Sequence, residues 1–406
     1  MPSAERADRV LDLVRGLTAE VRPHASHLTV TLDSPFDDLG IGSLELAELL
    51  LRLQDAFSVS LPPHVLGSAE TPRDLLRAVA RSHAVDAGVG VVSPPPPTAG
   101  SPPPAPVAAS TLIDALDWHL GATAGRTHIR ILDDSGGFDE LTYESLHREA
   151  AAAAAGLQAR DVMPGDTVAI MLPTSRAYFV TFAAVLLAGA VPVPIYPPAR
   201  RSQLAEHLRR HIGILGNAAA GLLVTVPEAV PLGHLLRANL DSLRHIVVPE
   251  SLSAAAGGAL PRPRATDLAL VQYTSGSTGQ PKGVALTHEN LLANIRAMGV
   301  AVEASGADTF VSWPPLYHDM GLIGAWFSSL YYGMPLVVMA PQVFLTRPSR
   351  WLRAIQANRG TISGGPNFAY ELCLAKITDA ELEGLDLSSW RFAFTGAEPV
   401  SPATIE

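Results

Sequence analysis

A proline-rich segment near residues 86–110 constrains the fold of this chain most, because it contains the runs Pro94–Pro97 and Pro102–Pro104. Proline has no backbone N–H to donate and favours an extended polyproline conformation, so such a segment builds no packed core. We therefore expect a semi-rigid linker at 86–110 between a small domain at 1–85 and a large domain at 111–406. A proline-rich motif that binds a partner protein is the alternative interpretation.

The composition is that of a folded protein with large apolar cores. The chain has 406 residues, of which 48% are hydrophobic and 17% charged, and a length above about 300 residues favours more than one domain. A formal charge of −10 disfavours nucleic acid as a partner, because such binding requires basic side chains that neutralise phosphates. A single cysteine, Cys373, excludes an internal disulfide framework and predicts a reducing, cytoplasmic location. We expect Cys373 to pack as a small hydrophobic residue.

Two long uncharged stretches, 177–199 and 320–346, have to be tested as membrane spans. Each is interrupted midway by glycine and proline, at 189–192 and at 333–335, so that neither half is long enough to cross a bilayer. A buried helix followed by a buried strand explains both stretches. The first twenty residues are typical of an amphipathic helix and lack the continuous apolar core of a signal peptide. We therefore predict no integral membrane span.

The two domains differ in their periodicity. In the small domain we expect a helix at about 5–21, a second helix after Ser43 and a last helix that begins near Pro72, which together make a small all-α bundle. The large domain alternates helix and strand. Helix is expected at 142–156 and strand at 167–172 and 268–273, and helix followed by strand is expected across 176–195, 200–226, 287–311, 321–339 and 349–364. That alternation predicts an α/β domain with substantial parallel sheet.

Ser43 follows the stretch Asp-Asp-Leu-Gly-Ile-Gly at 37–42 and precedes the second helix of the small domain. Serine at a helix start is often a plain N-cap, but an exposed serine there can also carry a phosphodiester, whose charge the helix end favours. The stretch resembles the phosphopantetheine attachment site of acyl and peptidyl carrier domains, over residues 5–83. The resemblance implies that a phosphopantetheinyl transferase attaches 4′-phosphopantetheine to Ser43. Gly42 stands where many acyl carriers have aspartate.

The strongest motif is the glycine-rich loop Tyr-Thr-Ser-Gly-Ser-Thr-Gly-Gln-Pro-Lys-Gly-Val at 273–284, which follows an apolar strand. Backbone N–H groups and hydroxyls of such a loop can converge on phosphate oxygens, and Lys282 adds an ammonium. It is not the nucleotide loop of P-loop NTPases, because Pro281 stands where glycine is required before the lysine.

This loop is similar to the phosphate-binding signature of the adenylate-forming superfamily, and the resemblance extends over residues 110–406. Several stretches within it look like those of fatty acyl-AMP ligases, namely 191–198, 313–322, 365–373 and 395–400. The resemblance implies ATP and Mg²⁺ as cofactors and a fatty acid as substrate.

The resemblance also implies roles for individual residues. The phosphates of ATP would be held by Thr274, Ser275, Gly276, Ser277, Thr278, Gly279 and Lys282. The adenine side would be formed by Gly396, Ala397, Glu398 and Pro399. The acyl site would be bordered by His318, Asp319, Met320, Gly321, Pro366, Asn367 and Phe368. Lys282 and His318 are the candidate catalytic residues. The plainer alternatives are that His318 is a core histidine, that Asp319 only orients it, and that Glu398 caps a turn.

His207 and His211 lie four residues apart in an expected helix. That spacing can bind a metal ion, but the basic residues between them favour a solvated basic face, and we expect no metal ligand within this chain. In the superfamily the magnesium-binding motif, the ribose-binding aspartate and a lysine of a mobile C-terminal domain follow the stretch that ends here at Pro399. Since the sequence stops at Glu406, we expect the chain to be a fragment. A natural truncation that serves as a carrier or scaffold is the alternative.

These expectations combine into one function. The chain would activate a long-chain fatty acid with ATP to acyl-AMP and pass the acyl group to a phosphopantetheine thiol. The acceptor would be its own carrier domain or a downstream polyketide or peptide synthase, in lipid, polyketide or lipopeptide biosynthesis. Two alternatives stay open, namely a long-chain acyl-CoA synthetase and a catalytically inactive carrier or scaffold module.

Overall fold

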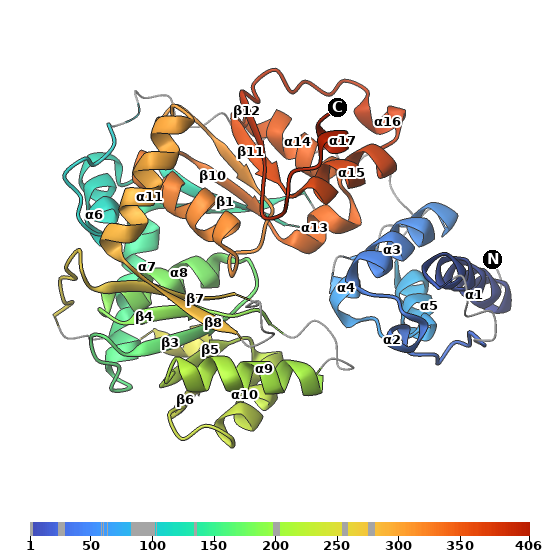
Figure 1. The fold of residues 1–406 in the computed structure, drawn as a ribbon, viewed down its shortest axis with the longest axis horizontal. Coiled ribbons are helices and arrows are strands. Elements are labelled where there is room, and N and C mark those ends of the chain that lie inside the picture. The colour runs from blue at the N-terminus through green and yellow to red at the C-terminus, as the bar shows by residue number, and fades with distance from the viewer. Residues whose placement is uncertain are drawn as a thin grey trace.

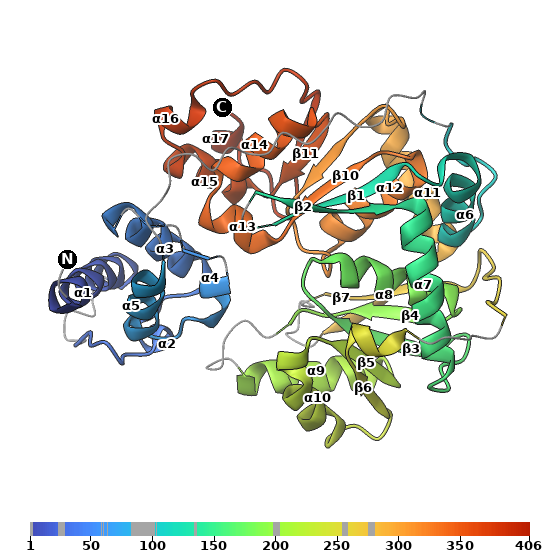
Figure 2. The ribbon, with the colours of Figure 1, turned by 180° about the vertical axis from the view of Figure 1, so that it is seen from behind.

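The computed structural model describes residues 3–22, 29–57, 59, 61–62, 64–82, 102, 104–133, 136–197, 204–253, 259–274 and 281–406. A small helical domain lies beside a larger α/β domain (Figure 1), and the view from behind shows the same arrangement (Figure 2). This is the predicted fold class, an all-α bundle followed by an α/β domain.

The helical domain consists of α1 (Ser3–Val21), α2 (Phe36–Leu39), α3 (Ser43–Phe57), α4 (His64–Ser68) and α5 (Pro72–Arg81). The three predicted helices are α1, α3 and α5. The last begins with Pro72 in its first turn and with a capping box between Thr71 and Asp74, which satisfies backbone N–H groups that have no partner within the helix. Apolar residues of α1, α3 and α5 form one core, which includes Val14, Leu50 and Leu75.

The larger domain contains two sheets and a hairpin. The six-stranded sheet has the order β12-β11-β9-β10-β1-β2, with β1 (Thr127–Leu132), β2 (Phe138–Thr142), β9 (Phe310–Ser312), β10 (Leu336–Met339), β11 (Ile362–Gly365) and β12 (Phe392–Thr395). The four-stranded sheet has the order β4-β3-β5-β6, with β3 (Thr167–Met171), β4 (Val191–Pro194), β5 (Leu222–Thr225) and β6 (His245–Val247). Strands β7 (Leu268–Thr274) and β8 (Lys282–Thr287) form an antiparallel hairpin whose β7 lies against β4.

Parallel pairing dominates, as the alternation of helix and strand predicts. Every strand pair of the four-stranded sheet is parallel, and in the six-stranded sheet only β2 runs antiparallel to its neighbour. Parallel strands need crossover connections, and helices supply them.

The helices of the larger domain precede and follow these strands along the chain. They are α6 (Leu112–Thr123), α7 (Tyr143–Gln158), α8 (Arg176–Leu187), α9 (Leu204–Asn217), η1 (Pro227–Ala229), α10 (Val230–Arg237), η2 (Pro249–Leu252), α11 (His288–Ala301), the π-helix η3 (Met320–Phe327), α12 (Ser328–Tyr332), α13 (Pro341–Thr346), α14 (Ser349–Asn358), α15 (Asn367–Lys376), α16 (Asp379–Leu382) and α17 (Pro402–Ile405). Helices α7 and α8 lie between the two sheets (Figures 1 and 2).

The largest apolar core joins the two sheets through α8. Phe179 and Phe182 of α8 pack edge-on against Trp326 of η3, with ring centroids 4.7 and 5.3 Å apart. The two uncharged stretches of the sequence are therefore core elements: 177–199 contains α8 and β4, and 320–346 contains η3, α12, β10 and α13. In the part of the chain that the structure describes, no helix is long and apolar enough to cross a membrane.

Candidate active site

The glycine-rich loop connects the two strands of the β7–β8 hairpin. Thr274, the last residue of β7, pairs in register with Lys282, the first residue of β8, and both side chains are exposed. The predicted phosphate-binding residues Ser275, Gly276, Ser277, Thr278 and Gly279 lie outside the described residues. The hairpin thus brings the two ends of the loop side by side.

A cavity of about 310 Å³ opens next to this hairpin. It is lined by Pro194, Ile195, Tyr196, Arg210, Ile214, Gln272, Tyr273, Thr274, Tyr317, His318 and Asp319. Thr274 of the predicted phosphate site and His318 and Asp319 of the predicted acyl site therefore line the same cavity. A concave, largely apolar pocket with a few convergent polar groups is the usual form of a small-molecule site.

His318 and Asp319 form an ion pair at the mouth of this cavity. The Nδ1 atom of His318 lies 2.7 Å from Oδ1 of Asp319, and the backbone N–H of Met320 donates to the same oxygen at 2.7 Å. The bond to Asp319 raises the pKa of His318 against the opposing effect of burial, and the bond to His318 lowers the pKa of Asp319. His318 is 47% exposed, so it is not the core histidine that the sequence allowed as an alternative. Asp319 orients the ring and favours its protonated form, which can donate to an anionic ligand.

The backbone before His318 is held by the core of the domain. The buried hydroxyl of Tyr178, on α8, donates to the carbonyl oxygen of Leu316 at 2.7 Å. A Cβ atom on Gly321 would lie 2.5 Å from the carbonyl oxygens of both Pro314 and Pro315. Only glycine allows η3 to begin this close to its own preceding loop, and that contact fixes the position of the His318–Asp319 pair.

The predicted adenine-side and acyl-side segments meet at Asn367. Its Nδ2 donates to the carbonyl oxygen of Pro399 at 2.8 Å, and its Oδ1 accepts from the hydroxyl of Thr395 at 3.1 Å. A Cβ atom on Gly396 would lie 3.5 Å from Cε of Met320, so these two segments are in contact.

The remaining predicted residues flank this meeting point. Ala397 has a left-handed backbone with φ of 67°, which is uncommon for a residue with a side chain, and Ala397, Glu398 and Pro399 are exposed. Pro366 precedes α15, and the ring of Phe368 packs edge-on against Trp313, with centroids 5.9 Å apart. Trp313 is buried in the aromatic cluster with Phe344.

The expectation of a solvated basic face around His207 and His211 is wrong. His207 is 5% exposed and His211 is fully buried, their rings stack with centroids 3.7 Å apart, and Tyr196 packs edge-on against both. Burial lowers the pKa of His207 to about 3 and that of His211 to about 4, so both rings are neutral at physiological pH. The pair forms the layer behind Tyr196 in the cavity wall.

The spacing of buried residues along α9 carries the signal that the sequence interpretation missed. His207, His211, Ile214 and Leu215 recur at helical spacing and are the buried residues of this helix. The basic residues between the histidines turn to other sides, and the guanidinium of Arg210 lies 5.7 Å from the ring centroid of Tyr196. Across the described ranges, no group of three or more His, Cys, Asp or Glu side chains could hold a metal ion.

Cys373 packs as the sequence predicts. It is partly buried on α15 among apolar side chains of the cluster that contains Trp313 and Phe344, and burial raises the pKa of its thiol to about 12. Such a thiol stays protonated and unreactive at neutral pH.

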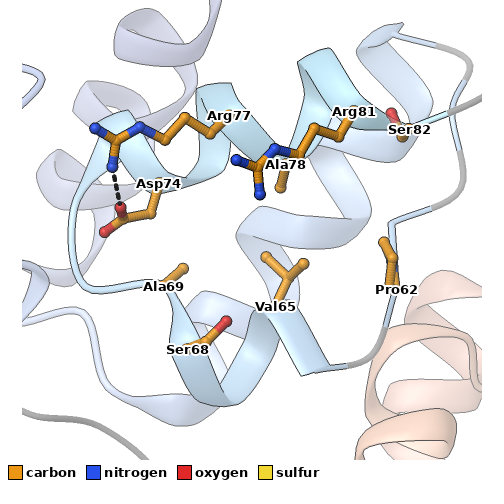
Figure 3. Close-up of a pocket in the computed structure, with 9 residues that line it drawn as sticks. All are labelled: Pro62, Val65, Ser68, Ala69, Asp74, Arg77, Ala78, Arg81 and Ser82. Atoms are coloured by element: carbon orange, nitrogen blue, oxygen red, sulfur yellow. Dashed lines mark hydrogen bonds and ion pairs between the residues drawn. The ribbon is translucent and has the colours of Figure 1, made fainter.

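The helical domain holds a second cavity, of about 410 Å³, between α4 and α5 (Figure 3). It is lined by Pro62, Val65, Ser68, Ala69, Asp74, Arg77, Ala78, Arg81 and Ser82. Arg77 and Asp74 form an ion pair at its rim. The predicted attachment residue Ser43 begins α3, and its side chain lies outside the described part of the structure.

Comparison with known proteins divides the chain into two parts. Residues 116–406 match the model of the AMP-binding enzymes, and residues 8–79 match that of the phosphopantetheine attachment site. The chain is 33% identical to the medium-chain-fatty-acid–[acyl-carrier-protein] ligase TtuA of Teredinibacter turnerae, over 64% of this chain and 46% of that protein. It is 35% identical to the corresponding ligase JamA of Moorena producens, over 73% of this chain and 51% of that protein.

A solved structure of a fatty acid AMP ligase is also similar to this chain. The fatty acid AMP ligase from Legionella pneumophila superimposes with a TM-score of 0.68 at 34% identity, over 74% of this chain and 51% of that one. The chain thus spans about half the length of the curated relatives it matches.

Proposed function

Because the chain belongs to the AMP-binding enzymes and carries a phosphopantetheine attachment domain, we propose that it activates a fatty acid as acyl-AMP and transfers the acyl group to a carrier thiol. The observation that supports this proposal best is the shared cavity, since the end of the glycine-rich loop and the His318–Asp319 pair line one wall of it. We place the reaction in the cytoplasm, in keeping with a single cysteine of unreactive character.

The proposed first step is attack of a carboxylate oxygen on the α-phosphorus of ATP. A bond forms between that oxygen and phosphorus, and the bond from the α-phosphorus to the bridging oxygen breaks, so that pyrophosphate leaves with the electron pair. Lys282 and the loop donors would stabilise negative charge on the phosphates, and protonated His318 would hold an acidic group at the cavity mouth. The adenine would lie along Gly396–Pro399.

The described residues do not fit Mg²⁺ by themselves. Among them, no three or more His, Cys, Asp or Glu side chains form a cluster that could hold a metal ion. The part of the chain described here contributes positioning and charge.

The cavity lining supports a substrate with an apolar body and an acidic head. Ile195, Tyr196, Ile214 and Tyr317 supply apolar surface, while His318 supplies a donor at the exposed end. The relatives named above are ligases of medium-chain fatty acids, and the solved relative is a fatty acid AMP ligase. A fatty acid is therefore the proposed substrate.

The proposed second step is transfer to a thiol. When attached to Ser43, 4′-phosphopantetheine supplies the nucleophilic sulfur. Ser43 is the first residue of a 15-residue helix, and the helix N-terminus favours the negative charge of a phosphodiester. A carrier acceptor is proposed over coenzyme A because the chain has its own attachment domain and because the relatives TtuA and JamA are named as ligases of an acyl-carrier protein. A downstream polyketide or peptide synthase would receive the acyl group.

Exchange of labelled pyrophosphate into ATP tests the first step. In protein that contains residues 1–406, exchange should depend on a fatty acid and should fall at least about tenfold in Lys282→Ala, since a hydrogen bond to a charged group contributes about 1.5–3 kcal/mol. Arg15→Ala is the matched control, because Arg15 is an exposed basic residue on α1 of the helical domain and takes no part in the proposed chemistry. Exchange that is equal in both variants would remove Lys282 from the phosphate site. Formation of acyl-CoA faster than acyl-carrier would favour the acyl-CoA synthetase alternative.

Incubation with a phosphopantetheinyl transferase and coenzyme A tests the attachment site. Mass spectrometry should show one added phosphopantetheine in the wild type and in Ser68→Ala, and none in Ser43→Ala. A wild type that gains no mass would contradict the carrier assignment.

A further inference from the structure

In the described part of the chain, the helical domain, called the carrier domain from here on, contacts the larger domain through α3 and α4. Helices α3 and α4 lie against α13, with the C-terminal end of α15 next to them (Figures 1 and 2). Leu345 of α13 packs both on the apolar core of the carrier domain and on the cluster around Trp313 and Phe344. The two domains therefore share a continuous apolar contact through one side chain.

A buried glutamine makes this contact specific. The Nε2 of Gln54, on α3, donates to the carbonyl oxygen of Thr346 at 3.3 Å. The same side chain is only 9% exposed, and its Oε1 accepts from the backbone N–H of Leu61 at 2.9 Å. Because that internal bond fixes the orientation of the amide, its donor points out of the carrier domain toward the larger domain.

An ion pair lies beside this contact between the two domains. The Nζ of Lys376, the last residue of α15, donates to Oε1 of Glu48 on α3 at 2.9 Å. Glu48 also accepts from Arg52 at 2.8 Å, and Arg52 pairs with Glu20 of α1 at 2.6 Å. Partial burial opposes ionisation of Glu48, but the bonds from Lys376 and Arg52 prevail and lower its pKa. Glu48 is thus held as a carboxylate that faces the larger domain.

Lys376 is a lysine in a chain whose basic residues are almost all arginines. Of its 29 basic residues only two are lysines, Lys282 and Lys376, and all others are arginines. One lysine follows the glycine-rich loop and the other reaches the carrier domain. Both amines can therefore be addressed selectively in an experiment.

We propose that the face formed by α13 and the C-terminal end of α15 is a docking site for the chain's own carrier domain, held by Lys376 and Glu48. This goes beyond the proposed chemistry and does not depend on it. The helix that docks is α3, which begins at Ser43, so docking covers the Glu48 side of the helix that follows the attachment residue. A partner enzyme that binds the acidic side of α3 has to displace Lys376 first.

Zero-length crosslinking of the full chain tests this docking. A carbodiimide activates a carboxylate, the neighbouring amine displaces the activated oxygen, and an amide forms with net loss of one water. Since only two side chains carry amines, peptide mass spectrometry should find Lys376 joined to Glu48 as the main inter-domain product. A product that joins Lys282 to the carrier domain in its place, or a modified Lys376 with no link to α3, would overturn the proposal.

Variants that change the charge of Lys376 or Glu48 show whether the crosslink between these residues reflects docking of the carrier domain. Lys376→Arg keeps the ion pair but cannot be crosslinked, so small-angle scattering should give it the radius of gyration of the wild type. Lys376→Ala should lower the ratio of docked to free carrier about two- to fivefold, as expected for a partly exposed ion pair. Lys376→Glu should lower that ratio further. The double variant Glu48→Lys with Lys376→Glu should recover both the compact radius and the crosslink. An unchanged radius in Lys376→Glu would contradict the assigned role of the pair.

Mixing separates docking within one chain from docking between two copies. Isotope-labelled Lys376→Arg, which retains Glu48, is crosslinked in the presence of unlabelled Glu48→Gln, which retains Lys376. The proposal predicts no link between labelled and unlabelled peptides. A link there that equals the wild-type yield would show that the site binds the carrier domain of a second copy instead.

Discussion

Asn367 holds Pro399 by a single side-chain hydrogen bond, in which Nδ2 donates to the carbonyl oxygen at 2.8 Å. The other end of the same amide accepts from the hydroxyl of Thr395 at 3.1 Å and from the backbone N–H of Ser401 at 3.3 Å. One buried residue thus connects the start of α15 to both ends of the segment proposed to face the adenine.

Replacing this amide should loosen the segment and weaken nucleotide binding. In Asn367→Ala we expect a loss of about 1–3 kcal/mol in the free energy of unfolding, because buried partners are left unsatisfied. Affinity for ATP should fall as well, since the segment loses its fixed position. Asn239→Ala is the control, as Asn239 is exposed just after α10 and its side chain donates to the carbonyl oxygen of Leu235, four residues earlier. Unfolding by urea and calorimetric titration measure the two effects; a destabilised variant with unchanged ATP affinity would separate the segment from the nucleotide.

Replacement by alanine should affect protein stability differently at two glycines of η3. In Gly321→Ala the new methyl group meets the carbonyl oxygens of Pro314 and Pro315 at 2.5 Å, and relief of that clash should cost about 1–3 kcal/mol of stability. In Gly324→Ala the nearest atom is 3.8 Å away, so the variant should be neutral or slightly more stable. Comparison of their urea midpoints checks this. Equal midpoints would mean that the loop before His318 shifts freely.

The buried histidine pair should make stability fall with acid. His211 has its pKa lowered to about 4, whereas an unfolded chain gives it about 6.5, so the unfolded state binds more protons in the interval between those values. The contribution is complete above about pH 6.5 and is lost as the pH falls through about 4. In His211→Gln the loss of stability between about pH 7 and pH 5 should be smaller than in the wild type by about 1–2 kcal/mol.

Thermal melting across this pH range measures the difference. His234→Gln, at an exposed position on α10, should show the same change of melting temperature with pH as the wild type. If the melting temperature falls equally with pH in all three proteins, the histidine pair is not buried as neutral rings.

Salt should release the carrier domain from its docking site. Lys376 and Glu48 are 24% and 31% exposed, so their attraction is screened when the Debye length falls from about 10 Å at 0.1 M salt to about 3 Å at 1 M. The radius of gyration of the wild type should therefore rise with salt. In Lys376→Glu the same screening weakens a repulsion, so its radius should stay constant or fall. A rise of equal size in both proteins would assign the salt effect to another contact.

Local sequence signals were sufficient for most of the fold. Helix α5 follows from Pro72 and the polar residues around it, and β7 follows from an apolar run that ends at a glycine-rich turn. The alternation from α7 to β11 follows from periodicity alone. The β1–β2 hairpin was not predicted, because its polar residues, such as Arg130 and Glu140, pair with each other across the strands and obscure the apolar pattern.

The candidate site was predicted only in part, because its cavity is made by distant segments. His318, Asp319 and Thr274 came from motifs, but Arg210 and Gln272 stand 62 residues apart in the chain and only the fold places them on one wall. His207 and His211 were misjudged because nearby arginines suggested a solvated helix. The burial of a histidine depends on what packs over it, and Tyr196 comes from a different element.

Helix α15 carries a different contact at each of its two ends. Asn367 at its first residue holds the segment proposed to face the adenine, and Lys376 at its last residue holds the carrier domain. Ten helical residues span only about 15 Å, and a helix of this kind transmits a tilt or a shift from one end to the other. A ligand that moves the first turn also moves the lysine, and by thermodynamic reciprocity the departure of the carrier domain changes affinity for that ligand by the same factor. Binding at one end of this helix and docking at the other are then coupled, whichever event comes first.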